Sequence, residues 1–198
     1  MIAPDTLPIL PIKGSLLLPA GQISQKIFET RYLNMIQDAL ASQDRLIGVC
    51  IVEGFNNKKD NLFKVGCTGK ITTFKELVDG SFLIILTGYC RFKLGSEVST
   101  MRQYRRFKID ICGFEDDIIV DPNSDINREE LIDLIIKYSY THSIVTDRSL
   151  LNNIPNFNLV TFFAMHLPFS DKQRQLLLEA KKVEDRAVLM CNIIKASL

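Results

Sequence analysis

Ile27-Phe28-Glu29-Thr30-Arg31-Tyr32-Leu33-Asn34-Met35 is the stretch of sequence that decides how this chain folds. It continues the strand-like segment Ile23–Phe28 and leads into a segment with helical periodicity. The apolar residues at that spacing are Tyr32 or Leu33, Ile36 and Leu40. Because Thr30 is of a type that caps helices, the pattern predicts a strand-to-helix corner capped by Thr30.

The rest of the first half is typical of β-structure. Alternating or short apolar runs predict several strands, separated by turn residues and by one exposed polar loop. The predicted strands are Leu7–Ile12, an edge strand interrupted by proline, Leu46–Val52 and Arg105–Phe114; the loop is Gly54–Asn61 and an early turn is Pro19-Ala20-Gly21.

A hairpin is the clearest local signal in this half. The arms Lys70–Val78 and Ser81–Thr87 are separated by Asp79-Gly80. Two residues of this kind tolerate the positive φ angles of a type I′ turn, so the sequence predicts a tight two-residue connection.

The composition changes at Glu115–Asn127, an acidic segment that contains Pro122 and indicates a linker. Helical patterns follow it: one helix capped by Asn127 or Asp125, a mostly apolar one over 156–167, one opened by the capping box Ser170–Gln173, and a last one over about 184–196. The predicted class is α+β, with a β-rich part over 5–118 and a helical part over 119–198.

Composition and charge argue against several classes of function. The chain has 198 residues, 46% of them hydrophobic and 24% charged, which fits one globular domain. A formal net charge of +1 gives no basis for binding nucleic acid or an anionic membrane. No apolar run is long enough to span a bilayer, and Met1–Asp5 lacks the features of a signal peptide. We therefore expect no membrane partner.

The cysteines favour a reducing compartment. There are five, an odd number, and none lies within three residues of another. A disulfide scaffold needs paired cysteines, and a zinc site needs close pairs such as C-x-x-C. We expect free thiols, no metal and a cytoplasmic location.

Four blocks of sequence resemble the N-terminal substrate-binding domain of Lon proteases, the LON domain. They occur in the family's order and cover nearly the whole chain: Leu7–Gly21, Ile27–Met35, Val65–Ile71 and Leu86–Phe92. The chain departs from the family pattern in having Leu18 for the usual Phe, Ala20 inserted before Gly21 and an extra Cys67. The tail Leu167–Ser170 is similar to the family's late helix entry.

The resemblance implies a fold and a function. The fold would be a twisted β-barrel-like (PUA-like) half with one early helix, joined to a helical half. The function would be non-catalytic recognition of unfolded or tagged polypeptide by a standalone bacterial type that lacks the ATPase and peptidase domains. No cofactor is implied; the partners would be a polypeptide substrate, a protease or chaperone, or another copy of the chain.

An exposed apolar groove is the chemistry that such recognition needs. Leu16-Leu17-Leu18-Pro19 is the first candidate, because three successive leucines cannot all point inward on a strand. The alternative is that these residues pack under the helical half, and the sequence leaves both interpretations open.

Charged residues beside the family blocks are further candidates. Glu29 and Arg31 would form a recognition pair, or Glu29 would bond backbone donors at the helix start while Arg31 packs on Tyr32. We prefer the structural interpretation, because such pairs recur at strand-to-helix corners. Arg91, which precedes Phe92 on a predicted strand, is equally ambiguous.

Two other classes of function remain as alternatives. An RNA-binding PUA-like module would use the basic and aromatic stretch Arg102–Lys108, although Tyr104 and Phe107 would then have to point outward. An enzyme would need His142 or His166 close to a cysteine or a carboxylate, and the sequence places neither at metal-ligand spacing. The segment 66–71 resembles a phosphate loop but lacks its first glycine and the Ser or Thr after Lys70.

Overall fold

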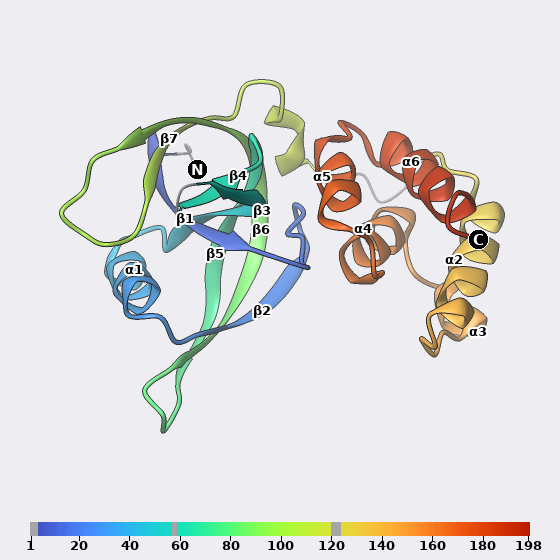
Figure 1. Ribbon diagram of the computed structural model, residues 1–198. Helices are drawn as coiled ribbons and strands as arrows, with labels where there is room; N and C mark the ends of the chain where they lie inside the picture. Colours follow the sequence, from blue (N-terminus) through green and yellow to red (C-terminus); the bar gives the residue numbers. More distant parts are fainter. Residues whose placement is uncertain (1–3, 57–58, 120–123) are drawn as a thin grey trace.

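The computed structural model describes residues 4–56, 59–119 and 124–198. A β half and a helical half lie side by side (Figure 1). The β half contains β1 (Thr6–Ile12), β2 (Gln22–Ile27), α1 (Thr30–Ala41), β3 (Leu46–Asn56), β4 (Lys59–Leu62), β5 (Val65–Glu76), β6 (Phe82–Val98) and β7 (Arg106–Asp110). The helical half contains α2 (Arg128–Thr141), α3 (Arg148–Leu151), α4 (Asn156–His166), α5 (Asp171–Glu179) and α6 (Val183–Lys195). A 3-10 helix, η1 (Glu115–Ile118), lies between the halves in sequence.

The sheet closes on itself but is not a simple barrel. Its strand order is β1-β7-β6-β5-β3-β4, and an additional pairing of β1 with β3 closes the ring. The β1–β3 pair is parallel and the other pairs are antiparallel. In the part of the chain described, β2 and β4 lie off the closed ring, β2 on β6 and β4 on β3. The expected α+β class is therefore present, as a mostly antiparallel sheet with helices.

The strand-to-helix corner forms where the sequence predicts it, but its cap differs. The N-cap residue is Glu29, whose backbone is extended, and Thr30 is already helical. The side chain of Glu29 makes no cap hydrogen bond. The helix buries Tyr32, Met35, Ile36 and Ala39, so burial of this apolar face holds α1 in place.

The hairpin between β5 and β6 has a longer loop than predicted. Leu77 N–H donates to the Ser81 carbonyl at 2.8 Å, which leaves Val78, Asp79 and Gly80 in the loop. Gly80 has a φ of 76° and Asp79 is not in the positive region, so the two-residue type I′ turn is wrong. A three-residue loop needs only one left-handed residue, and glycine supplies it without steric cost.

Other differences concern where elements end. The segment predicted as a polar loop, 54–61, contains the end of β3 and the start of β4, which pair with each other. The strand predicted over 105–114 is shorter, Arg106–Asp110, and the short helix α3 was not predicted. The predicted Asn127 cap and the Ser170–Gln173 capping box are both present. Short-range caps were thus easier to predict than strand ends, which depend on pairing with distant residues.

One hydrophobic core passes through both halves. Its buried residues include Ile47 and Ile84 from the sheet, Met35 from α1 and Leu159 and Ile194 from the helical half. A second, smaller cluster fills the ring near Phe92, which is fully buried. The two halves therefore share packing rather than meeting only at polar surfaces.

Candidate functional site

The leucines predicted to line a groove are buried. Leu16, Leu17 and Leu18 are 0%, 1% and 0% exposed, and Pro19 is buried as well. The prediction of an exposed groove here is wrong, because these residues lie between strands rather than on one and need not alternate. Gly88 gives them room: a Cβ atom there would lie 2.0 Å from the Leu18 carbonyl oxygen.

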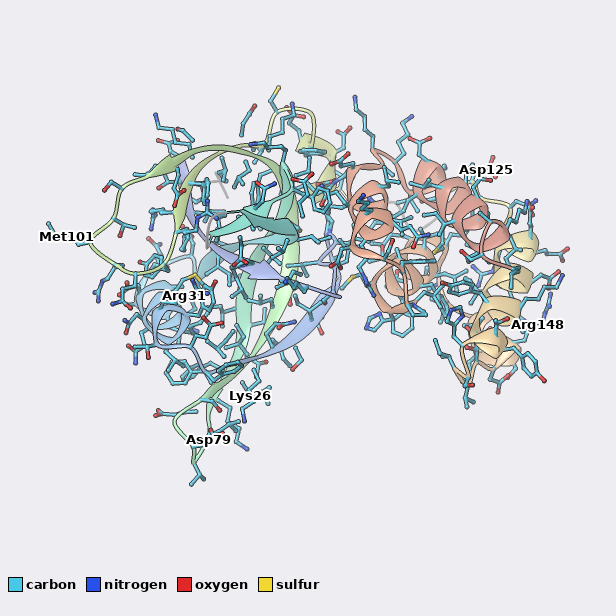
Figure 2. All side chains as sticks on the ribbon, in the orientation of Figure 1. Lys26, Arg31, Asp79, Met101, Asp125 and Arg148 are labelled. Atoms are coloured by element: carbon cyan, nitrogen blue, oxygen red, sulfur yellow. The ribbon has the colours of Figure 1, made fainter. Side chains whose placement is uncertain are left out.

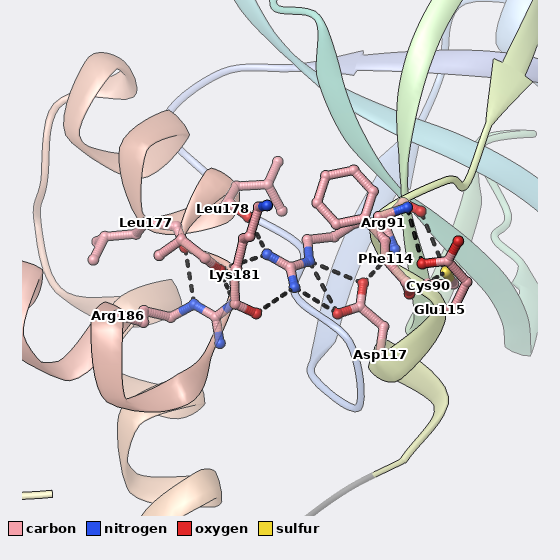
Figure 3. A network of polar contacts seen from close by, with 11 residues as sticks. Cys90, Arg91, Phe114, Glu115, Asp117, Leu177, Leu178, Lys181 and Arg186 are labelled. Atoms are coloured by element: carbon pink, nitrogen blue, oxygen red, sulfur yellow. Dashed lines mark hydrogen bonds and ion pairs between the residues drawn. The ribbon is translucent and has the colours of Figure 1, made fainter.

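Arg91 is also buried, at the centre of a polar network between the halves (Figure 3). Its side chain is 3% exposed and pairs with Asp117, 7% exposed, at 2.6 Å between Nη2 and Oδ1. The guanidinium also donates to the carbonyls of Leu178, at 2.9 Å, and Lys181, at 2.8 Å. A residue engaged in this way has no free donor for a polypeptide, so the recognition role of Arg91 is wrong.

The network ties three elements that are far apart in sequence. Arg91 lies on β6, Asp117 on η1, and the carbonyl groups lie in the last turn of α5 and just beyond it, where the helix dipole favours a cation. Beside them, Arg186 donates to the Leu177 carbonyl at 2.8 Å. Burial, and then the charge of Arg91, lowers the pKa of Arg186 to about 10. The network is a structural link between the halves.

The structure does not favour the basic and aromatic stretch 102–108 as a nucleic-acid surface. Tyr104 and Phe107 are 6% and 5% exposed, so their rings are not available to stack on bases. Two of the three arginines have an acidic partner: Arg102 pairs with Asp38 at 3.2 Å and Arg105 with Glu97 at 2.9 Å. Arg106 donates to the Thr6 hydroxyl at 2.8 Å. The inward-packing interpretation of Tyr104 and Phe107 is confirmed.

The two histidines are held within their own helices. A ring nitrogen of His142 lies 2.9 Å from the Tyr138 carbonyl oxygen, and that of His166 lies 2.8 Å from the Phe162 carbonyl oxygen. Each ring also packs on the aromatic ring four residues earlier, with centroids 4.2 Å apart. Over the described ranges, no group of three or more His, Cys, Asp or Glu could hold a metal ion.

Glu29 and Arg31 are the predicted site residues that remain at the surface. Their side chains are 46% and 42% exposed and form an ion pair of 2.8 Å. The Arg31 guanidinium also lies 4.5 Å from the centre of the Tyr32 ring, as the structural interpretation predicts. Glu29 bonds Arg31 rather than backbone donors, so that part of the interpretation is wrong. Burial raises the pKa of Tyr32 to about 12, which keeps the phenol neutral under the guanidinium.

Phe28 completes this region, which we call the α1 corner: Phe28, Glu29 and Arg31. Phe28 is 71% exposed although it is large and apolar. Phe28 is not among the site residues predicted from the sequence, although the alternation of buried and exposed residues before it predicts its exposure. Ile23 and Ile27 alternate inward along β2, so Phe28 falls on the opposite face.

Two hollows adjoin the α1 corner. The larger one, about 640 Å³, lies between Arg31 and the connection from β6 to β7. It is lined by Arg31, Asp60, Glu97, Val98, Ser99, Thr100, Arg102, Gln103, Tyr104 and Arg105. The smaller one, about 160 Å³, is bordered by Leu10–Lys13 at the end of β1 and by Gln25–Glu29. The α1 corner therefore borders both hollows, the larger one through Arg31 and the smaller one through the exposed Phe28.

The fold is that of a domain of α+β class, a mostly antiparallel sheet joined to a group of helices. The profile described as the ATP-dependent protease La (LON) substrate-binding domain matches residues 6–196, and the chain belongs to this family.

Curated relatives and solved structures agree with this assignment. The chain is 25% identical to the Lon protease of Cytophaga hutchinsonii over 96% of its length, and 26% identical to that of Flavobacterium johnsoniae over 93%. It spans about a quarter of these relatives, 24% and 23%.

Two solved structures share the fold. One is a Lon N-terminal domain protein from Xanthomonas campestris, with a TM-score of 0.64, 23% identity and coverage of 94% of this chain and 97% of that one. The other is the N-terminal domain of Mycobacterium avium complex Lon protease, with a TM-score of 0.68, 14% identity and coverage of 98% and 100%. Within the residues described, no helix combines the length and apolar character needed to cross a membrane.

Proposed function

We propose that this chain is a non-catalytic recognition module that binds unfolded polypeptide at the α1 corner. Membership of a family of substrate-binding domains supports the class of function. The observation that carries the location is Phe28, a phenylalanine that is 71% exposed and lines the smaller hollow. Aromatic side chains of this kind supply much of the binding energy at interfaces.

The charges of the larger hollow support a polypeptide ligand rather than nucleic acid. Arg31, Arg102 and Arg105 each have an acidic partner, which leaves no strong positive field. A mixed-charge surface beside an apolar ring suits unfolded chains, which expose side chains of every type. The polypeptide would pass from this module to a protease or chaperone.

The thiols support placing this activity in the cytoplasm. Cys50, Cys67 and Cys90 are buried and unpaired, and Cys112 is exposed and unpaired. An exposed free thiol is typical of a reducing compartment.

Binding to an unfolded protein tests the proposal. The probe is reduced, carboxymethylated α-lactalbumin, labelled with fluorescein and titrated with the chain; native α-lactalbumin is the folded comparison. We expect Phe28→Ser to weaken binding of the unfolded probe by about fivefold or more, because losses above about 1 kcal/mol mark the central residues of an interface. Val145→Ser, at a fully exposed position of the helical half, is the matched control and should bind as wild type does.

Two results would contradict the proposal. One is equal binding of the folded and unfolded probes. The other is an unchanged affinity in Phe28→Ser, which would move the binding surface away from the α1 corner.

A further inference from the structure

β2 leads into the α1 corner and has one unoccupied edge. It pairs with β6 over Gln22–Ile27, and no other strand of the described chain pairs with it. Figure 1 shows β2 at the margin of the β half, with β6 along one side. The strands β1, β3, β5, β6 and β7 form the closed ring and so have neighbours on both sides.

The hydrogen-bond pattern identifies which backbone groups face outward. Gly88 N–H donates to the Gly21 carbonyl at 2.8 Å, and these two residues continue the β2–β6 register. In an antiparallel pair, bonded and non-bonded pairs alternate, so Ile23, Gln25 and Ile27 bond β6. The N–H and C=O groups of Gln22, Ser24 and Lys26 therefore point away from the sheet.

The same alternation follows from the other side of β6. Leu77 N–H donates to the Ser81 carbonyl, which places every second residue of β6 from Ser81 onward toward β5. The intervening residues, Phe82, Ile84 and Leu86, then face β2. The Gly88–Gly21 and Leu77–Ser81 hydrogen bonds thus independently assign the same backbone groups of β2, those of Gln22, Ser24 and Lys26, to the outer edge.

No backbone hydrogen bond joins the outward groups of this edge to another described segment, although Leu10–Lys13 lie across the smaller hollow from its second half. Lys26, the charged residue of this strand, reaches Asp79 on the β5–β6 hairpin at 2.8 Å (Figure 2). Gln22 likewise turns to Thr87 on β6, at 3.2 Å.

The comparison with β4 shows that an open edge is not general in this fold. β4 has four residues, and the Asp60 carbonyl on it accepts a hydrogen bond from Arg105 at 2.7 Å. β2 has six residues, no proline and no such cover. Natural sheets usually protect an edge of this length with proline, charge or a bulge.

We propose that an extended polypeptide segment adds to the outer edge of β2 as a further strand. Outward N–H and C=O groups recur every second residue, roughly every 6.8 Å, and an extended chain carries the matching groups at the same spacing. The second half of the edge borders the 160 Å³ hollow, which has room for a side chain of the added strand. Phe28 follows at the end of the edge, 71% exposed.

This mode of binding explains selectivity for unfolded chains and rests on the proposed function. Backbone groups of a folded protein are already paired, whereas an unfolded segment offers them freely. Recognition through the backbone is also largely independent of sequence, which a module with many clients requires.

A proline placed at Ser24 tests the edge directly. Proline removes the outward N–H of Ser24 without removing a bond to β6, and edge strands accept it at such positions. With unfolded, carboxymethylated α-lactalbumin as the probe, we expect Ser24→Pro to bind about fivefold or more weakly, since an unmade hydrogen bond in an interface leaves its partner unsatisfied. Ser24→Ala keeps the N–H and should bind as wild type does. Equal affinity of Ser24→Pro and wild type would overturn the inference while leaving the proposed function intact, whereas no binding by wild type would remove both.

Hydrogen exchange on the wild-type chain gives a second measurement that does not depend on a variant folding. In the free protein, the amides of Ser24 and Lys26 should exchange quickly and those of Gln25 and Ile27 slowly. Saturating probe should slow Ser24 and Lys26 by about tenfold or more. Unchanged exchange at Ser24 and Lys26 with the probe bound would overturn the proposal. So would a concentration-dependent dimer that Ser24→Pro converts to monomer, because a second copy would then occupy the edge.

Discussion

Arg91→Ala should destabilise this protein more than any surface substitution. The variant removes the cationic partner of the Asp117 carboxylate, 7% exposed, which keeps the hydrogen bond from the backbone N–H of residue 91. It also removes the donor that serves the carbonyls of Leu178 and Lys181. Breaking a buried ion pair on one side costs about 3–5 kcal/mol. A domain is stable by only about 5–15 kcal/mol, so this single change removes a large part of its free energy of unfolding.

Urea denaturation followed by circular dichroism measures this effect. Arg148→Ala is the matched control, because its pair with Asp133 is 53% and 51% exposed, and exposed pairs contribute about 0–1 kcal/mol. A loss in Arg91→Ala no greater than that of Arg148→Ala would refute the reasoning. The double variant Arg91→Met with Asp117→Leu removes both charges and should recover much of the loss, since the unpaired carboxylate is the costly element.

Two further predictions concern packing and thiol reactivity. Gly88→Ala should cost about 3 kcal/mol in the same urea assay, because its Cβ would lie 2.0 Å from the Leu18 carbonyl oxygen; Gly54→Ala, where a Cβ meets nothing within 4 Å, should be close to neutral. At pH 8, iodoacetamide should modify Cys112, which is exposed, and should leave Cys50 unmodified, as measured by mass spectrometry. Burial raises the pKa of Cys50 to about 12, so at pH 8 the thiolate fraction of Cys50 is about 10⁻⁴. Rapid modification of Cys50 without denaturant would show that the sheet opens around it.

The parts of the fold that follow local rules could be predicted from the sequence. The helices of the second half follow from periodicity, and the caps at Asn127 and Ser170 follow from side chains that bond backbone within three residues. The closure of the sheet through β1 and β3 could not be predicted in the same way. It depends on pairing Ile9 with Gly48, residues that no local pattern connects.

The candidate site was harder to predict because burial depends on the neighbouring layer. Leu16–Leu18 looks exposed only if it forms a strand, and it lies in an irregular segment where every side chain can turn into the core. Arg91 looks available until Asp117, from a segment predicted as a linker, is placed against it. Phe28 could be predicted from alternation along β2, because one face of that strand is buried and the other is not. The open edge of β2 could not, because it depends on which strands pair with β2.

In this geometry, a structural role of Glu29 and Arg31 can itself support binding at the α1 corner. Burial of Tyr32 fixes the chain where β2 turns into α1, and the Glu29–Arg31 ion pair and the packing of Arg31 on Tyr32 add a smaller contribution. A fixed turn holds Phe28 in the solvent and keeps the β2 edge extended before any ligand arrives. Binding then loses less conformational entropy than it would on a mobile loop. Arg31→Ala should therefore weaken binding of an unfolded probe by less than Phe28→Ser does, through loss of order at the corner rather than loss of a contact. A wild-type affinity in Arg31→Ala together with faster amide exchange at Phe28 would show that this order does not contribute to binding.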